Sequence, residues 1–284
     1  MVFNDVFVVL VLYKKSLSTS ETLKTLGDFL NFSINIFVFD NSPDRQYDAE
    51  YFDYKKFRVR YFHDGSNPGL STAYNLAIEE AIKINKNWIL LLDQDTIFTR
   101  EFVSEISTIN FSKLHIDTVA IIPKVLSLEN NIISPAKMYL GGLCRPIKID
   151  SGLAYDALTG INSGTIINIG FVKKIGGFNT SFALDMLDHW YFREIYKSNK
   201  KVLVLNCQIY QNLSVAGDYE NEVSVTRYYK MLIAEELFVK QDGIFAYVIF
   251  ILRLIRRALK QMRFKNKQYF FMSLKTIFNL NHRL

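Results

Sequence analysis

The chain has 284 residues, of which 49% are hydrophobic and 22% charged, a composition that predicts a globular protein with a sizeable core. Two cysteines, Cys144 and Cys207, are too few for a disulfide framework and lack metal-site spacing, which is typical of a reducing compartment. No run approaches the roughly 18 apolar residues of a membrane-spanning helix. The N-terminus lacks the pattern of a signal peptide, so we interpret Val6–Leu12 as a first strand.

The net charge of +6 is spread unevenly along the chain. Residues 243–284 contain nine Lys or Arg and no Asp or Glu, so the first 242 residues carry 25 basic and 28 acidic side chains and a net charge of −3. This distribution argues against a nucleic-acid-binding body and for a basic tail with its own anionic partner. We therefore expect a catalytic domain over residues 1–242 and a tail over residues 243–284.

Strand and helix signals alternate through the first half, the pattern of an α/β sheet flanked by helices. Continuous apolar runs predict the strands Val6–Leu12, Ile34–Phe39, Val59–Phe62, Trp88–Leu92, Val119–Ile122 and, later, Val202–Leu205. The capping box Ser18-Thr-Ser-Glu21 predicts the start of one helix, and Asn67-Pro68-Gly69 precedes another. Further helices are expected at Phe171–Ile175, Trp190–Tyr196, 223–241 and from Ile244 onward.

The most informative segment runs from Trp88 to Thr96, where an apolar strand ends in Asp93 and Asp95. Two hard oxygen ligands at a strand end suit Mg²⁺ or Mn²⁺, and these cations usually accompany a phosphate-bearing substrate. An Asp-x-Asp pair is common, and the alternative is a polar turn that merely ends the strand.

Further carboxylates follow other predicted elements. Asp40 comes after the second strand and can either bind a ligand or stabilise the turn Asp40-Asn41-Ser42-Pro43. Asp185 and Asp188 lie three residues apart, so on a helix they would share one face. They can equally be a solvated helix start, because acids favour that end.

Taken in order, these features resemble family 2 inverting glycosyltransferases of the GT-A fold, particularly bacterial rhamnosyltransferase-like enzymes of surface polysaccharide synthesis. The resemblance covers roughly residues 6 to 195, and its set of motifs is specific although no single motif is. The motifs are Val8–Tyr13, Asp40-Asn41-Ser42-Pro43, Asn67-Pro68-Gly69 with Asn75, Leu91–Asp95, Ser163-Gly164, and Ile175–Phe178 leading into Leu184–Asp188.

The resemblance implies a mixed GT-A sheet and transfer of a sugar, with inversion, from a nucleoside diphosphate to an acceptor hydroxyl. It implies nucleotide-sugar binding by Leu12, Tyr13, Asp40, Asn41, Asn67, Gly69, Asn75, Asp93, Gln94, Ser163, Gly164 and Arg227. Asp95, assisted by Asp93, would hold the metal, which stabilises the leaving diphosphate. Asp188 would be the general base, with Asp185, His189 and Trp190 supporting it or lining the acceptor site.

Some positions leave alternatives open. Asn67 can be a turn residue, Asn75 a helix-surface residue, Trp190 a core residue, and Arg227 a surface ion-pair partner. Gln211 stands where many family members carry a metal-ligating His, so it either ligates the metal more weakly or leaves the position to diphosphate and water. Two further positions after the base depart from the family pattern: Trp190 occupies the place of a carboxylate, and Arg193 lies one residue from the expected place of an arginine. Acceptor handling is therefore expected to differ.

Other classes of protein fit less well. A nicotinamide dehydrogenase needs Gly-x-Gly-x-x-Gly after the first strand, and residues 12–16 contain no glycine. A nucleotidyltransferase would want a glycine-rich basic loop there. A catalytically silent nucleotide-binding or scaffold protein stays open because of Gln211, and so does a UDP-hexose donor in place of dTDP-rhamnose.

The tail predicts contact with a membrane surface. Ile244–Leu252 is almost wholly apolar, and basic residues follow it at helical spacing: Arg253, Arg256, Arg257, Lys260 and Arg263. The alternative is a tail that packs on the catalytic domain with its cations solvated. The membrane interpretation implies a peripheral enzyme at the inner face of the cytoplasmic membrane, acting on a saccharide or lipid-linked oligosaccharide acceptor.

Overall fold

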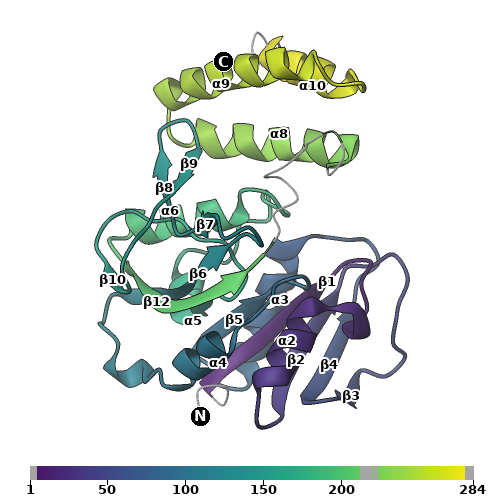
Figure 1. Cartoon of the computed structure of the whole chain (residues 1–284), viewed down its shortest axis with the longest axis vertical. Helices are drawn as coiled ribbons and strands as arrows, with labels where there is room; N and C mark the ends of the chain where they lie inside the picture. The colour runs from purple at the N-terminus through teal and green to yellow at the C-terminus, as the bar shows by residue number, and fades with distance from the viewer. Residues whose placement is uncertain (1–4, 212–219, 221–222, 279–284) are drawn as a thin grey trace. The chain divides into compact units, whose positions relative to one another are not determined.

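The computed structural model describes residues 5–211, 220 and 223–278, which divide into two compact units (Figure 1). The first unit comprises residues 1–137 and 146–212, and the second comprises residues 138–145 and 213–284. The helix α8 (Val225–Lys240) therefore groups with the tail, whereas the sequence pattern suggested a boundary at residue 242.

A ten-stranded sheet forms the first unit, in the order β10-β12-β6-β11-β5-β1-β2-β4-β3, with β7 pairing beside β6. Its strands are β1 (Val6–Leu12), β2 (Ile34–Asp40), β3 (Tyr51–Tyr54), β4 (Phe57–His63), β5 (Trp88–Leu92), β6 (Thr118–Leu126), β7 (Ile132–Ser134), β10 (Gly152–Ala154), β11 (Ile166–Asn168) and β12 (Lys201–Tyr210). A separate hairpin joins β8 (Ala136–Tyr139) to β9 (Leu143–Pro146).

The sheet is mixed, which confirms the predicted fold class. β5, β1, β2 and β4 run parallel, and so do β6 and β12. The short strand β11 lies between β5 and β6 and is antiparallel to both. Because the parallel strands end at one edge, residues that follow β1, β2 and β5 come together there.

Helices of the first unit cover the sheet between these strands. They are α2 (Glu21–Phe29), α3 (Leu70–Lys83), α4 (Arg100–Ser107), α5 (Ile169–Lys174) and α6 (Leu187–Lys197), with short 3₁₀ turns η1 (Leu17–Thr19) and η2 (Phe111–Lys113). The capping box was assigned to the wrong serine: Ser20 caps α2 by accepting from the backbone N–H of Leu23, while Ser16 begins η1.

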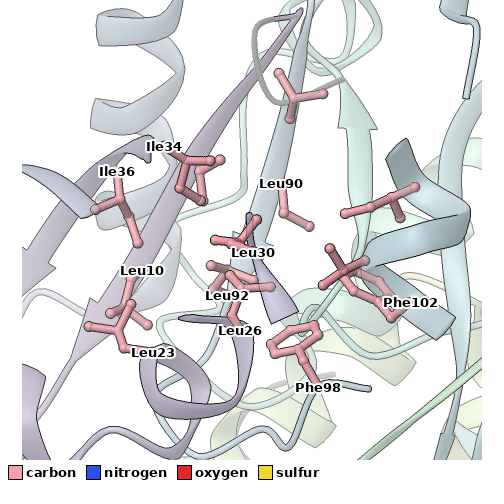
Figure 2. Close-up of a cluster of buried hydrophobic side chains, with 14 of the residues drawn as sticks. Leu10, Leu23, Leu26, Leu30, Ile34, Ile36, Leu90, Leu92, Phe98 and Phe102 are labelled. Carbon is pink, nitrogen blue, oxygen red and sulfur yellow. The ribbon is translucent and has the colours of Figure 1, made fainter. Parts of the chain in front are cut away.

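The core on one face of the sheet is aliphatic and aromatic (Figure 2). Alternate residues of β1, β2 and β5 point to this face, where α2 and α4 cover them. The labelled members are Leu10, Leu23, Leu26, Leu30, Ile34, Ile36, Leu90, Leu92, Phe98 and Phe102. Most of the opposite residues of the same strands are also buried, and α3 packs against β1 and β5. Burial on both faces explains why these strands read as continuous apolar runs.

The second unit contains three packed helices, α8, α9 (Ile244–Gln261) and α10 (Gln268–Phe278). A closed ring of buried hydrogen bonds joins them: Gln261 Nε2 donates to the Tyr228 hydroxyl at 2.7 Å, the Tyr228 and Ser273 hydroxyls lie 2.6 Å apart, and Ser273 Oγ donates to Gln261 Oε1 at 2.7 Å. Within the described residues, none of the helices combines the length and hydropathy that crossing a bilayer requires.

Candidate active site

Three acidic side chains lie near one another at the carboxyl edge of the sheet. Asp93 and Asp95 follow β5 directly, and Asp188 lies in the first turn of α6. Asp93 is half-buried and Asp95 is exposed. Burial, followed by the negative charges of Asp95 and Asp188, raises the pKa of Asp93 to about 7. The predicted metal-binding pair and the predicted base are therefore close enough to interact electrostatically.

Gln211 joins this cluster from the end of β12. Its Nε2 lies 3.2 Å from Asp93 Oδ2 and 3.4 Å from Asp95 Oδ1, so both carboxylates converge on one small region. The Gln211 Oε1 atom is buried and has no hydrogen-bond partner among the residues described. Exchanging the two ends of the amide would direct that oxygen at the carboxylates.

This donor set fits a hard divalent cation. Two convergent carboxylates, one of which has a pKa raised by burial and then by the charge of its neighbour, favour a positive charge between them. The orphaned amide oxygen of Gln211 can supply a third ligand, and Mg²⁺ typically completes its shell with water and substrate phosphate. In the described part of the chain, no three His, Cys, Asp or Glu side chains cluster as metal ligands, so Asp93 and Asp95 would carry the charge.

Tyr74 belongs to the site although the sequence analysis did not select it. It is fully buried on α3, and burial together with the charges of Asp93 and Asp188 raises its pKa well above the usual value. Its hydroxyl has no hydrogen bond of standard geometry to any described residue. Tyr74 lies three residues before Ala77, so helical spacing places it on the inward face of α3. This spacing was the signal in the sequence that could have identified Tyr74. An inward tyrosine, however, usually indicates core packing.

The residues around Asp188 divide into site and core. Asp188 is half-buried, and its Oδ1 accepts from the backbone N–H of His189 at 2.8 Å. His189 Nδ1 lies 2.7 Å from Thr159 Oγ1. Trp190 is buried, with its ring 6.4 Å from that of Phe178, which favours the core interpretation.

The expectation that Asp185 and Asp188 share one helical face is wrong. α6 begins only at Leu187, and Met186 before it has a left-handed φ of 66°. Asp185 therefore lies in the turn before the helix, where it is half-buried.

Asp40 is completely buried at the end of β2. Its Oδ1 accepts from Ser42 N at 2.8 Å, and its Oδ2 accepts from the Tyr61 hydroxyl at 2.7 Å and Gln46 Nε2 at 2.8 Å. Burial, followed by the hydrogen bond to Asp40, raises the pKa of Tyr61 to about 12. The neighbouring Asn41 is also buried, and its backbone N–H donates to Leu12 O at 2.8 Å. These bonds give Asp40 a structural role in the turn, and a nucleoside base would have to displace Gln46 to reach it.

Tyr13 and Gln94 form a clasp between the segments that follow β1 and β5. Tyr13 N donates to Gln94 Oε1 at 2.8 Å, and Gln94 Nε2 donates back to Tyr13 O at 3.2 Å. Leu12, which precedes Tyr13, is fully buried. Tyr13 itself is exposed, so it offers a ring to a ligand at this edge.

Gly69 and Asn75 hold the segment that leads into α6. A Cβ atom on Gly69 would lie 2.4 Å from Ala183 O, so only glycine allows this approach. The Asn75 amide donates to Phe178 O and accepts from Phe178 N, both at 2.8 Å. Asn67, with a left-handed φ of 53°, forms the turn before the helix. The Asn-Pro-Gly motif and Asn75 therefore position the chain that carries Asp188.

Ser163 and Gly164 form hydrogen bonds to the segment that carries Asp93. Ser163 is fully buried; its hydroxyl lies 3.4 Å from Asp93 N and also bonds the Thr96 hydroxyl. Gly164 N donates to Leu91 O at 2.8 Å. Both residues therefore fix the position of the acidic loop. Arg227 belongs to the second unit, in the first turn of α8, and its predicted phosphate contact stays a prediction.

Comparison with known proteins identifies the class. The family model described as "Glycosyl transferase family 2" matches residues 7–108, from β1 to the end of α4, a segment that includes Asp40, Asp93 and Asp95. This match covers little more than a third of the chain, and together with the fold it indicates a glycosyltransferase. A search of curated proteins gave no match.

Two solved structures of TarS from S. aureus resemble the chain in outline. One has 15% identity and a TM-score of 0.47, covering 95% of this chain and 55% of TarS. The other, TarS 1–349 in complex with UDP-GlcNAc, has 15% identity and a TM-score of 0.49, covering 96% of this chain and 81% of that one. This chain thus spans little more than half the length of the first structure.

Proposed function

We propose that the enzyme transfers a sugar, with inversion, from a nucleoside diphosphate sugar to a hydroxyl of a saccharide acceptor, with Mg²⁺ or Mn²⁺ as cofactor. The observation that carries this proposal is that Asp93, Asp95 and Asp188 lie close enough to interact electrostatically at the sheet edge of a glycosyltransferase. A leaving diphosphate needs positive charge, and an acceptor hydroxyl needs a base, so both requirements have candidates at one place.

Asp188 is the proposed general base. Its carboxylate takes the proton of the acceptor hydroxyl while the acceptor oxygen forms a bond to the anomeric carbon and the bond from that carbon to the diphosphate breaks. Attack from the face opposite the diphosphate inverts the configuration. Asp188 is half-buried at the start of α6, where a hydrogen bond from His189 N fixes one oxygen and leaves the other for the acceptor.

Asp95 and Asp93 would hold the divalent cation, with Gln211 as a third ligand after reorientation of its amide. Bound there, the cation neutralises the charge that develops on the departing diphosphate. The clasp between Tyr13 and Gln94 and the hydrogen bonds from Ser163 and Thr96 hold the acidic loop in place before substrate arrives.

The finer assignments concern donor and acceptor. The sequence resemblance favours dTDP-rhamnose, with a UDP-hexose as the second candidate, and Arg227 as a diphosphate contact. The basic tail favours a lipid-linked acceptor in cell-surface polysaccharide synthesis, with the enzyme peripheral on the inner face of the cytoplasmic membrane.

A panel of dTDP- and UDP-sugars tests the proposal by thermal shift with and without Mn²⁺, followed by hydrolysis of each sugar that binds. A true donor raises the melting temperature in the presence of Mn²⁺, because a ligand that binds only the native state stabilises it. Slow Mn²⁺-dependent hydrolysis of the same sugar is also expected. Binding without any hydrolysis would favour a catalytically silent protein, and no binding across the panel would contradict the proposal.

A further inference from the structure

The helix α9 has two apolar faces, and only one of them is used inside the second unit. The inward face packs in the three-helix unit and consists of Ala246, Tyr247, Phe250, Leu254, Ala258 and Gln261. Leu254 belongs to this buried set, with 1% of its surface exposed. Packing within the second unit therefore buries one face of α9 and leaves the other face uncovered.

A second apolar row of α9 lies exposed. Its members, called here the outer row, are Phe245, Val248, Leu252, Ile255, Leu259 and Met262. They recur at intervals of three and four residues, so they share one face along about 25 Å of helix. Their exposure ranges from 40% for Ile255 to 78% for Phe245. Single exposed apolar side chains are common, but an aligned row is typical of a surface that another apolar phase covers.

Exposed cations flank the outer row. Arg256, Lys260 and Arg263 are exposed, and Arg256 and Arg263 lie one helical turn after Leu252 and Leu259. Two of the five predicted headgroup cations are used within the unit instead: Arg257 forms a bidentate pair with Glu235 at 2.7 and 2.8 Å, and Arg253 donates to Gly141 O. Three cations thus remain beside the apolar row.

Charge decides between the possible occupants of this surface. A second copy would bring another row of Arg256, Lys260 and Arg263 beside the first, and residues 243–284 contain no acid to balance it. An anionic lipid surface supplies both an apolar phase for the outer row and phosphates for the cations. We infer that the outer row of α9 is the face by which the enzyme lies on an anionic membrane, with Arg256, Lys260 and Arg263 against lipid phosphates; the benefit to catalysis rests on the proposed function.

Vesicle flotation of the full chain tests this assignment, using phosphatidylcholine with and without phosphatidylglycerol. The first variant is Leu252→Ser with Leu259→Ser, and the second is Arg256→Gln with Lys260→Gln and Arg263→Gln. Matched controls in the first unit are Ile116→Ser with Leu128→Ser, both exposed apolar residues, and Lys113→Gln with Lys173→Gln and Lys174→Gln, all exposed. Circular dichroism checks that every variant is folded.

The wild type should bind only vesicles that contain phosphatidylglycerol, and added salt should weaken the binding. The charge variant should lose about a hundredfold in partitioning, since each surface cation contributes about fivefold. The leucine variant should lose at least about tenfold, and both controls should bind like the wild type. Wild-type affinity in either α9 variant, no binding by the wild type, or a wild-type dimer that the leucine variant converts to monomer would overturn the inference.

The nucleotide site provides an independent measurement in the same proteins. Mn²⁺-dependent binding of UDP and dTDP in solution, without vesicles, should be equal in the wild type and both α9 variants. Vesicle binding without nucleotide binding would contradict the proposed function and support the membrane-binding face. Nucleotide binding without vesicle binding would support the proposed function and contradict the membrane-binding face.

Discussion

At the scale of single residues, the site depends on two neighbouring carboxylates that repel each other unless a cation lies between them. The carbonyl oxygen of Asp93 accepts from the Thr22 hydroxyl and its N–H lies beside the Ser163 hydroxyl, so its backbone is fixed close to Asp95. The resulting repulsion contributes to its pKa of about 7. Asp188 adds a third negative charge from the helix α6. The proposed base and the proposed cation site therefore influence each other electrostatically.

Substituting Asp188 by Asn separates the roles of these carboxylates. We expect turnover to fall by roughly two to four orders of magnitude, the usual worth of a positioned base, while donor affinity stays near that of the wild type. Calorimetric titration of the donor and a steady-state rate measurement check this. A collapse of donor affinity would move Asp188 into the donor site and make Asp185 the next candidate for the base.

The site was only partly predictable from sequence, and the reason differs between residues. Asp93 and Asp95 could be predicted as site residues because they end an apolar strand. A strand buried on both faces cannot continue through two charged side chains. Asn75 and Ser163 matched a family pattern, but their hydrogen bonds to the Phe178 backbone and to the Asp93 loop depend on segments about 100 and 70 residues away. Tyr74 was missed because only the fold brings its hydroxyl toward Asp93 and Asp188.

At the scale of elements, α3 holds the segment before α6 through one side chain. The side-chain amide of Asn75 donates to the carbonyl oxygen of Phe178 and accepts from its N–H, so it satisfies both a backbone donor and a backbone acceptor. Removing it leaves two backbone groups without their partner, while the segment carries Asp188 ten residues further on.

Asn75→Ala should therefore lower the free energy of unfolding by about 1–3 kcal/mol. Urea titration measures this change, with Asn87→Ala, an exposed position, as the control. The affinity for nucleoside diphosphate should change little. A loss of that affinity at unchanged stability would instead make Asn75 a donor ligand, as the family pattern implies.

The three helices of the second unit depend on their buried polar ring. Each hydroxyl of the ring can donate once and accept once, and Gln261 closes it with both ends of its amide. Gln261→Ala should lower the free energy of unfolding by about 1–3 kcal/mol, because the buried Tyr228 and Ser273 hydroxyls each lose a hydrogen-bond partner that water cannot replace. Urea unfolding checks this against Gln268→Ala, which is exposed; equal stability of the two variants would show that the ring contributes nothing.

At the scale of the whole molecule, the sequence predicted the parallel half of the sheet well and the remainder poorly. β1 and β5 have the expected bounds, because strands buried on both faces give uninterrupted apolar runs. β3, β10 and β11 have three or four residues each and carry no such signal. β11 is also held by pairing with β5 and β6, which lie far from it in sequence. The grouping of α8 with the tail likewise depends on packing that periodicity does not reveal.

The proposed chemistry depends most directly on Asp95, which would hold a divalent cation for a nucleoside diphosphate. Calorimetric titration of UDP and dTDP, with Mn²⁺ and with EDTA, tests it in the wild type, in Asp95→Asn and in the exposed control Asp150→Asn. The wild type and the control should bind nucleotide tightly only with Mn²⁺, whereas Asp95→Asn should bind weakly and equally under both conditions. An Asp95→Asn protein that keeps the full Mn²⁺ dependence of the wild type would contradict a metal-binding role for Asp95.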